Sequence, residues 1–86
     1  MPGRDAEPAE FPALRYPRLL PRHSPIWIHV AGAWRRGHVL RWIRVDGRWL
    51  AWADHDNPDG YAWPTHGMYV YNPATIRPRH GGEPPG

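Results

Sequence analysis

Six aromatic side chains between residues 42 and 71 are the strongest candidates for a binding site. They come from three strand-like runs and from the loop before the last of these runs: Trp42, Trp52, Tyr61, Trp63, Tyr69 and Tyr71. Flat aromatic faces suit proline-rich peptides, arginine side chains and nucleic-acid bases alike. The chain has six Trp and four Tyr among 86 residues, and each large ring buries about 150–250 Å². A domain this small cannot enclose all of them, so we expect some to line a surface groove that binds a protein or peptide partner.

Arginine supplies the second kind of candidate chemistry. Five arginines are interleaved with tryptophan in the stretch 34–53: Arg35, Arg36, Arg41, Arg44 and Arg48. This pattern is typical of phosphate contacts combined with base stacking. Nucleic-acid binding through this basic band is therefore the alternative function. The chain has no Lys, and its Arg, Ala, Gly and Pro content indicates a GC-rich genome, so codon bias explains part of the arginine.

Metal binding has little support in the sequence. The six His form no His-x-His or His-x-x-x-His pair, and no Cys is present. Asp54 and Asp56 resemble the start of a calcium loop. However, Pro58 and Asp59 stand where such a loop needs an oxygen ligand and a glycine, and no Glu closes it. We expect no metal and no other cofactor.

Catalysis is not expected either. It would need a nucleophile beside a base, or two carboxylates with different pKa values, in one pocket. The single Ser, Ser24, lies in a proline-rich arm, and His55 between Asp54 and Asp56 is the one acid–base cluster, which we interpret as an exposed turn. The sequence therefore favours a non-catalytic interaction module.

A central hairpin must position these side chains. Two runs rich in aromatic and β-branched residues flank Asp46-Gly47. Asp-Gly between such runs is a strong hairpin signal, because a type I′ turn needs positive φ at both central positions. We predict strands at 37–45 and 49–54, with a β-bulge near Arg41, which interrupts the alternation. Alternation alone does not decide which face of these strands is buried.

Three further strands surround this hairpin in the prediction. Residues 26–30 alternate, with Ile26, Ile28 and Val30 on one face. A loop at 55–67 is dense in turn formers, and a strand at 68–71 follows it. A single helical turn at 72–75 then leads to a short final strand at 76–78. The expected fold class is all-β.

This order of elements resembles the small SH3-like barrel, in its Tudor/Agenet-type branch. The residues that carry the resemblance are Trp34, Gly37, Val39, Trp49, Ala51, Ala53 and Ile76-Arg77-Pro78. It covers about residues 26–78 and implies a five-stranded barrel with a 3₁₀ turn before the last strand. It also implies binding of peptides, modified side chains or nucleic acid. The chain lacks the Ala-Leu-Tyr-Asp-Tyr run of peptide-binding SH3 domains and a clear aromatic cage. Over its whole length it resembles small uncharacterised proteins of GC-rich bacteria.

Proline and glycine set the expected boundaries. The 12 Pro and 9 Gly concentrate toward the ends, so we predict a Pro-rich disordered arm at 1–24, the barrel at 25–79 and a disordered tail at 80–86. The arm also carries apolar residues that could dock on the barrel or on a partner: Phe11, Leu14, Tyr16, Leu19 and Leu20.

Composition also bears on the environment of the chain. The formal net charge is +3, and no run approaches the roughly 20 apolar residues of a membrane span, so no membrane partner is expected. The first ten residues include three acids and no apolar signal segment. The absence of Cys fits a cytoplasmic location. A self-associating structural protein is a third interpretation of the aromatic excess.

Overall fold

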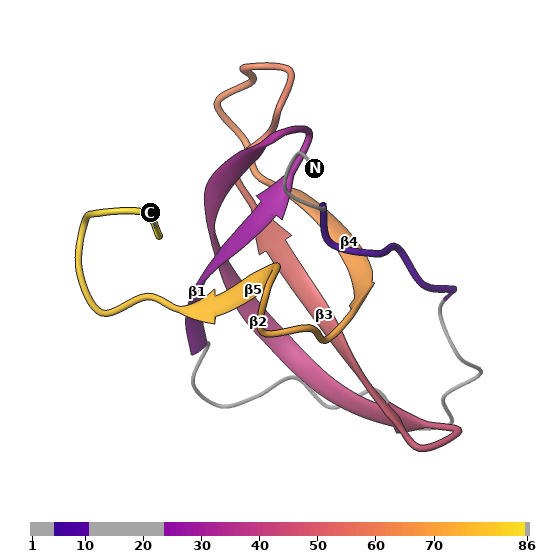
Figure 1. Cartoon of the computed structure of the whole chain (residues 1–86). Helices are drawn as coiled ribbons and strands as arrows, with labels where there is room; N and C mark the ends of the chain where they lie inside the picture. The colour runs from indigo at the N-terminus through magenta and orange to yellow at the C-terminus, as the bar shows by residue number, and fades with distance from the viewer. Residues whose placement is uncertain (1–4, 11–23, 86) are drawn as a thin grey trace.

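The computed structural model of the chain describes residues 5–10 and 24–85, and these residues form one antiparallel sheet without a helix (Figure 1). The five strands are β1 (Ser24–Val30), β2 (Ala33–Val45), β3 (Arg48–His55), β4 (Thr65–Val70) and β5 (Ile76–Pro78). Their order in the sheet is β4-β3-β2-β1-β5. Strands β1 to β4 pair with their neighbours in the chain, and β5 returns to pair with β1. The predicted all-β class is confirmed.

The sheet does not close on itself, because β4 and β5 are edge strands. Residues 5–10 lie along the β4 edge (Figure 1). There the Ala9 N–H donates to the Met68 carbonyl at 2.8 Å, and the Val70 N–H donates to the Glu7 carbonyl at 2.8 Å. This short segment therefore covers an edge that would otherwise present unpaired backbone groups.

The same segment also reaches β1. The Ala6 N–H donates to the His29 carbonyl at 2.7 Å, and Asp5 accepts hydrogen bonds from His29 Nδ1 at 2.7 Å and from the Gly32 N–H at 3.1 Å. These residues belong to the part of the chain that the sequence assigns to a disordered arm, but here they are bound to the sheet. The rest of that arm, residues 1–4 and 11–23 with its apolar side chains, lies outside the described residues.

Two hairpins are closed by tight turns. Asp46 and Gly47 have φ values of 50° and 77°, as the Asp-Gly signal predicts for a type I′ turn between β2 and β3. Ala31 and Gly32, with φ values of 51° and 78°, connect β1 to β2 in the same way.

A β-bulge divides β2 into two halves. The pairing with β3 shifts between Val39 and Arg41, which confirms the bulge predicted near Arg41. Val39 pairs with Ala53 before the bulge, and Trp42 pairs with Ala51 after it. Because cross-strand partners point to the same face, the extra residue puts Trp42 on the face of Val39. Simple alternation places these two side chains on opposite faces.

The core has two parts, one on each face of the sheet. The first buried cluster consists of Ala6, Ile26, Ile28, Val39, Ala51, Ala53 and Ile76, and we call its side the inner face. The second consists of Ile43, Leu50 and Met68, on the opposite side of β2, β3 and β4. Ala9 packs against this second cluster, so the N-terminal segment supplies part of its cover.

A capped turn connects β4 to β5. The N–H groups of Thr75 and Ile76 donate to the Asn72 carbonyl at 2.9 and 2.8 Å, and the Ala74 N–H donates to Asn72 Oδ1 at 2.9 Å. Asn72 thus caps a hydrogen-bonded turn at 72–75. The predicted 3₁₀ turn is not found there, and the described residues contain no 3₁₀ helix. Residues 80–85, the described part of the predicted tail, form no strand.

Candidate functional site

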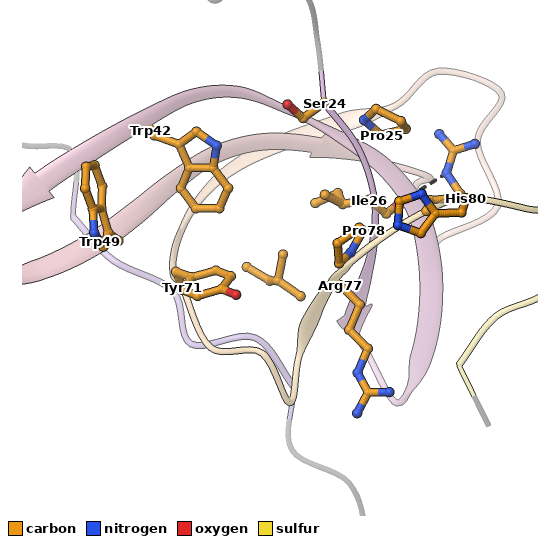
Figure 2. Close-up of a pocket in the computed structure, with 11 residues that line it drawn as sticks. Ser24, Pro25, Ile26, Trp42, Trp49, Tyr71, Arg77, Pro78 and His80 are labelled. Carbon is orange, nitrogen blue, oxygen red and sulfur yellow. Dashed lines mark hydrogen bonds between the residues drawn. The ribbon is translucent and has the colours of Figure 1, made fainter.

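An apolar groove of about 860 Å³ opens where the inner face reaches the surface. Its walls and floor are formed by Ser24, Pro25, Ile26, Trp42, Trp49, Tyr71, Ile76, Arg77, Pro78, Arg79 and His80. Figure 2 shows Trp42, Trp49 and Tyr71 on one side and residues of β1 and of the end of β5 on the other. We call this feature the aromatic groove.

The three rings are positioned by neighbouring strands. The bulge in β2 turns Trp42 toward the inner face, and Trp49 lies on the same face at the start of β3. Tyr71 follows β4 and is held beside Trp49, because the Tyr71 N–H donates to the Trp49 carbonyl at 2.8 Å. The rings of Trp42 and Tyr71 meet edge to face, with centroids 5.3 Å apart and planes at 80°, a favourable aromatic geometry.

The floor of the aromatic groove belongs to the core. Ile26 and Ile76 are buried at 4% and 2% relative exposure. Pro78 pairs with Ile26 across β1 and β5, and Pro25 precedes it in β1. The floor therefore sits on paired strands and is preformed. In contrast, Trp49 and Tyr71 remain 46% and 41% exposed, so much ring surface is available to a ligand.

The rim of the aromatic groove is basic. Arg79 and His80 lie on the β5 side, and the Arg44 guanidinium lies 5.2 Å from the Trp49 ring centroid on the other. Among the described residues, none that lines the groove is acidic. Arg77 points away from the rings in Figure 2. An apolar ligand with a negative charge near one end would complement this rim.

Two of the six predicted aromatic residues line this groove, and one lining ring was missed. Trp42 and Tyr71 are the predicted ones. The third ring, Trp49, was not among the candidates. One signal could have found it: Trp49 alternates with Ala51 and Ala53, two small residues suited to a crowded interior, and so shares their face at the exposed end of the hairpin.

Two other predicted residues pack elsewhere. Trp52 packs against the second core cluster, on the opposite face. Tyr69 is half-buried, and its hydroxyl lies 2.7 Å from Nε2 of the buried His55. Burial raises the pKa of Tyr69. Gly67 makes room for this ring, because a Cβ at that position would lie 2.7 Å from it.

The last two predicted residues form a pair in the loop between β3 and β4. Tyr61 and Trp63 stack with centroids 4.8 Å apart and planes at 14°. They are 56% and 62% exposed. Both rings border a second cavity of about 350 Å³, and neither of them lines the aromatic groove.

The five arginines of the predicted basic band are dispersed. Arg35 donates from Nε to the Val30 carbonyl at 3.1 Å, and the Arg36 guanidinium lies 6.0 Å from the Trp27 ring centroid. Arg41 is half-buried in β2, whereas Arg48 is exposed at the start of β3. Together with Arg44 at the aromatic groove, they occupy different faces and do not make one surface.

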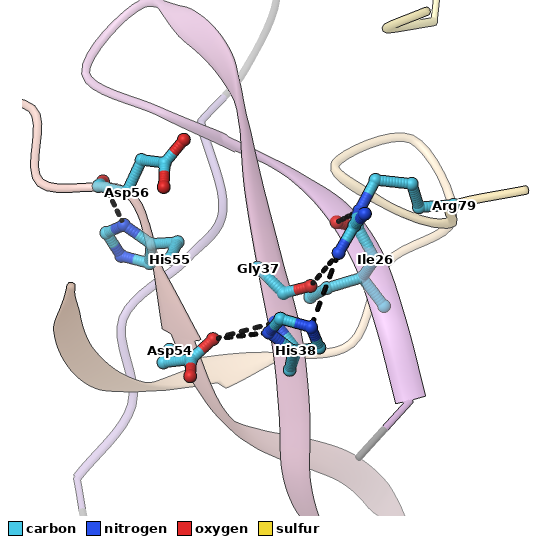
Figure 3. A network of polar contacts seen from close by, with 7 residues as sticks. All are labelled: Ile26, Gly37, His38, Asp54, His55, Asp56 and Arg79. Carbon is cyan, nitrogen blue, oxygen red and sulfur yellow. Dashed lines mark hydrogen bonds and ion pairs between the residues drawn. The ribbon is translucent and has the colours of Figure 1, made fainter. Parts of the chain in front are cut away.

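A polar network connects three strands near the second cavity (Figure 3). Asp54 Oδ1 accepts from the His38 N–H at 2.8 Å and lies 3.2 Å from His38 Nδ1. Arg79 donates to the carbonyls of Ile26 and Gly37 at 3.3 and 3.4 Å, and its Nη2 lies 3.4 Å from His38 Nε2. Arg79 thereby fixes the chain after β5 to β1 and β2.

Comparison with known proteins gives no identification. No family model matches the chain, and neither a curated protein nor a solved structure matches it. Within residues 5–10 and 24–85, no group of three or more His, Asp or Glu side chains could hold a metal ion. The same part of the chain contains no helix long and apolar enough to cross a membrane. The functional inference therefore comes from the geometry of the chain itself.

Proposed function

We propose that this chain is a small non-catalytic binding module with an SH3-like architecture, acting in the cytoplasm. Its ligand is an extended peptide segment of a protein partner, which carries proline or other apolar side chains beside an acidic one. The apolar part lies between the rings of Trp42, Trp49 and Tyr71, and the acidic side chain meets the basic rim.

The main observation behind this proposal is that exposed aromatic rings lie over a preformed floor of buried core residues. Trp49 and Tyr71 keep nearly half of their surface exposed, while Ile26 and Ile76 beneath them are buried in the core. Ligand sites are typically concave, mostly apolar and largely preformed. Flat rings in such a site suit the proline faces of an extended peptide.

The charge around the aromatic groove favours an acidic partner. Arg44, Arg79 and His80 lie around the opening, and no acidic residue lines it in the described part of the chain. The chain carries a formal net charge of +3. Complementary charge raises the association rate and suppresses wrong partners. A basic peptide would be repelled by the same rim.

The contacts of the N-terminal segment support the SH3-like interpretation. Residues 5–10 form backbone hydrogen bonds with β4 at one side of the sheet and with β1 near the other. Contacts of this kind between the two sides of a five-stranded sheet support the SH3-like interpretation, because a small barrel brings the edges of its sheet toward each other.

An array of extended peptides tests the proposed function. The full chain is probed against proline-containing peptides with acidic, neutral or basic flanks, and the best binder is titrated by calorimetry. We expect the acidic set to bind. Trp49→Ala should weaken binding at least about tenfold, since tryptophan in a central pocket is a typical hot spot.

Trp63→Ala is the matched control, because Trp63 is also an exposed indole but lies outside the aromatic groove. Its affinity for the peptide should stay within about twofold of the unmodified chain. Equal losses in both variants, or an array with no binder, would contradict the proposal.

A further inference from the structure

The side of the sheet opposite the aromatic groove carries a second set of rings and cations. In β1, Trp27 pairs with Arg36 of β2 on one side and with Arg77 of β5 on the other. These partners point to the same face, so an Arg-Trp-Arg row crosses three strands. Two strand spacings put the two arginine backbones about 10 Å apart. We call Trp27, Trp34, Arg36 and Arg77 the arginine–tryptophan face.

Both arginines of this face lie against indole rings. The Arg36 guanidinium is 6.0 Å from the Trp27 ring centroid, and that of Arg77 is 5.8 Å from the centroid of Trp34. Both arginine residues are exposed. Stacking on a ring holds a guanidinium in place and leaves N–H groups at its edge to bind an anion, and the planar fork matches phosphate.

The stacked pair in the loop continues this face. The second cavity contains Arg36, His38 and Arg79 on the side of the sheet and Tyr61 and Trp63 on the side of the loop. Because the stacked rings of Tyr61 and Trp63 are exposed, they contribute little buried surface to the fold. They offer a flat platform to another ring system, beside cations that are already fixed.

The acidic residues near this face are mostly engaged. Asp54 binds His38, and Asp5 binds His29 at 2.7 Å. Asp56 is exposed at the border of the second cavity. The guanidinium groups of Arg36 and Arg77 make no ion pair in the described part of the chain, so their charge remains available to a ligand.

We propose that the arginine–tryptophan face, together with Tyr61 and Trp63, binds single-stranded nucleic acid. Arg36 and Arg77 contact successive phosphates along the row, and an unpaired base stacks on the Tyr61–Trp63 platform. Base–aromatic stacking beside a cationic track is the typical mode of sequence-tolerant single-strand binding. A duplex is a poor ligand, because its bases are already stacked. This site uses none of the three rings of the aromatic groove, although Arg77 and Arg79 also border that groove. Its phosphate contacts come from Arg36 of β2 and Arg77 of β5, so it uses only one arginine of the dispersed band.

Fluorescence anisotropy with a labelled single strand of about twelve nucleotides, as DNA and as RNA, tests this site in the full chain. We expect binding that weakens with salt, with a slope of log K against log[salt] of about −1.4, as for the two phosphate contacts of Arg36 and Arg77. The double variant Arg36→Gln/Arg77→Gln should reduce the magnitude of this slope by about 1.4. Trp63→Ala should weaken binding about tenfold.

Two control variants distinguish binding at this site from nonspecific electrostatic binding to a basic chain and from binding in the aromatic groove. Arg48→Gln removes an exposed charge away from the face and should leave affinity within about twofold. Trp49→Ala removes a ring of the aromatic groove and should do the same. Circular dichroism confirms that each variant is folded. No binding at about 50 mM salt, equal losses in Arg48→Gln and the double variant, or a preference for duplex would overturn the proposal.

Discussion

At the scale of single residues, His55 is a buried side chain with a contact at each ring nitrogen. It is buried at 2% relative exposure. Its Nδ1 lies 2.9 Å from the Asp56 carbonyl, which can only accept, so Nδ1 carries the proton. In the neutral ring Nε2 must then accept, and the Tyr69 hydroxyl donates to it at 2.7 Å. This hydrogen bond explains why Tyr69, a predicted partner-binding residue, packs against the interior of the sheet.

Tyr69→Phe should therefore destabilise the fold. The variant leaves a buried imidazole nitrogen without its donor, which costs about 1–3 kcal/mol. Urea unfolding monitored by circular dichroism measures the change in the free energy of unfolding. Tyr71→Phe is the matched control, because Tyr71 is exposed, and it should change this free energy by less than about 0.5 kcal/mol. Equal effects in the two variants would refute the assigned role of Tyr69.

At the scale of elements, the bulge in β2 decides which ring reaches the aromatic groove. One extra residue between Val39 and Arg41 puts Trp42 on the inner face and Ile43 in the second cluster. The sequence signals a bulge, because Arg41 interrupts an apolar alternation. Which face each side chain takes depends on the register of β2 with β3. The sequence alone therefore does not distinguish Trp42, on the inner face, from Trp52, on the opposite face.

The segment at 5–10 is an element that sequence patterns do not reveal. Its attachment depends on Asp5, which binds the Gly32 N–H and His29. Burial raises the pKa of Asp5, but these hydrogen bonds and the charge of His29 outweigh that effect, so its pKa lies below the ordinary value of 3.8. A carboxyl group with a lowered pKa in the folded state stabilises the fold above its unfolded pKa, and this contribution disappears as the pH falls through the folded value.

Asp5→Asn should remove this contribution. Because the side chain of Asp5 is 46% exposed, screening by water limits the loss to at most about 1 kcal/mol at neutral pH. Denaturant unfolding at neutral pH and near pH 3 measures it. The difference between the variant and the unmodified chain should shrink at the lower pH, because protonation of Asp5 removes its contribution. Glu10→Gln provides the comparison, since Glu10 is exposed in the same segment. A pH-independent difference would contradict the assignment.

At the scale of the whole molecule, local patterns predicted the strands but long-range contacts determined the site. Alternation and the Asp46-Gly47 turn are properties of neighbouring residues, so the hairpin and the all-β class followed from the sequence. The aromatic groove joins Trp49 to the end of β5, and the arginine–tryptophan face joins Arg36 to Arg77 through β1. Residues so far apart in the chain meet only after the sheet has formed.

The two proposed sites use opposite faces of strands β1 and β5. In β5, Ile76 and Pro78 line the aromatic groove, while Arg77 between them borders this groove and extends its guanidinium to Trp34 on the arginine–tryptophan face. A chain of this design could hold a peptide on one side and a nucleic acid strand on the other. Of the large rings, Trp49 and Tyr71 are exposed at the first surface and Tyr61 and Trp63 at the second, whereas Trp27 is buried.

The most direct test of the central claim uses the six indole N–H signals in a nitrogen–proton NMR spectrum of the full chain. On addition of the acidic, proline-containing peptide selected by the array, the signals of Trp42 and Trp49 should shift, and those of Trp27 and Trp63 should stay in place. Shifts confined to Trp27, Trp34 or Trp63, with Trp42 and Trp49 unchanged, would contradict the account.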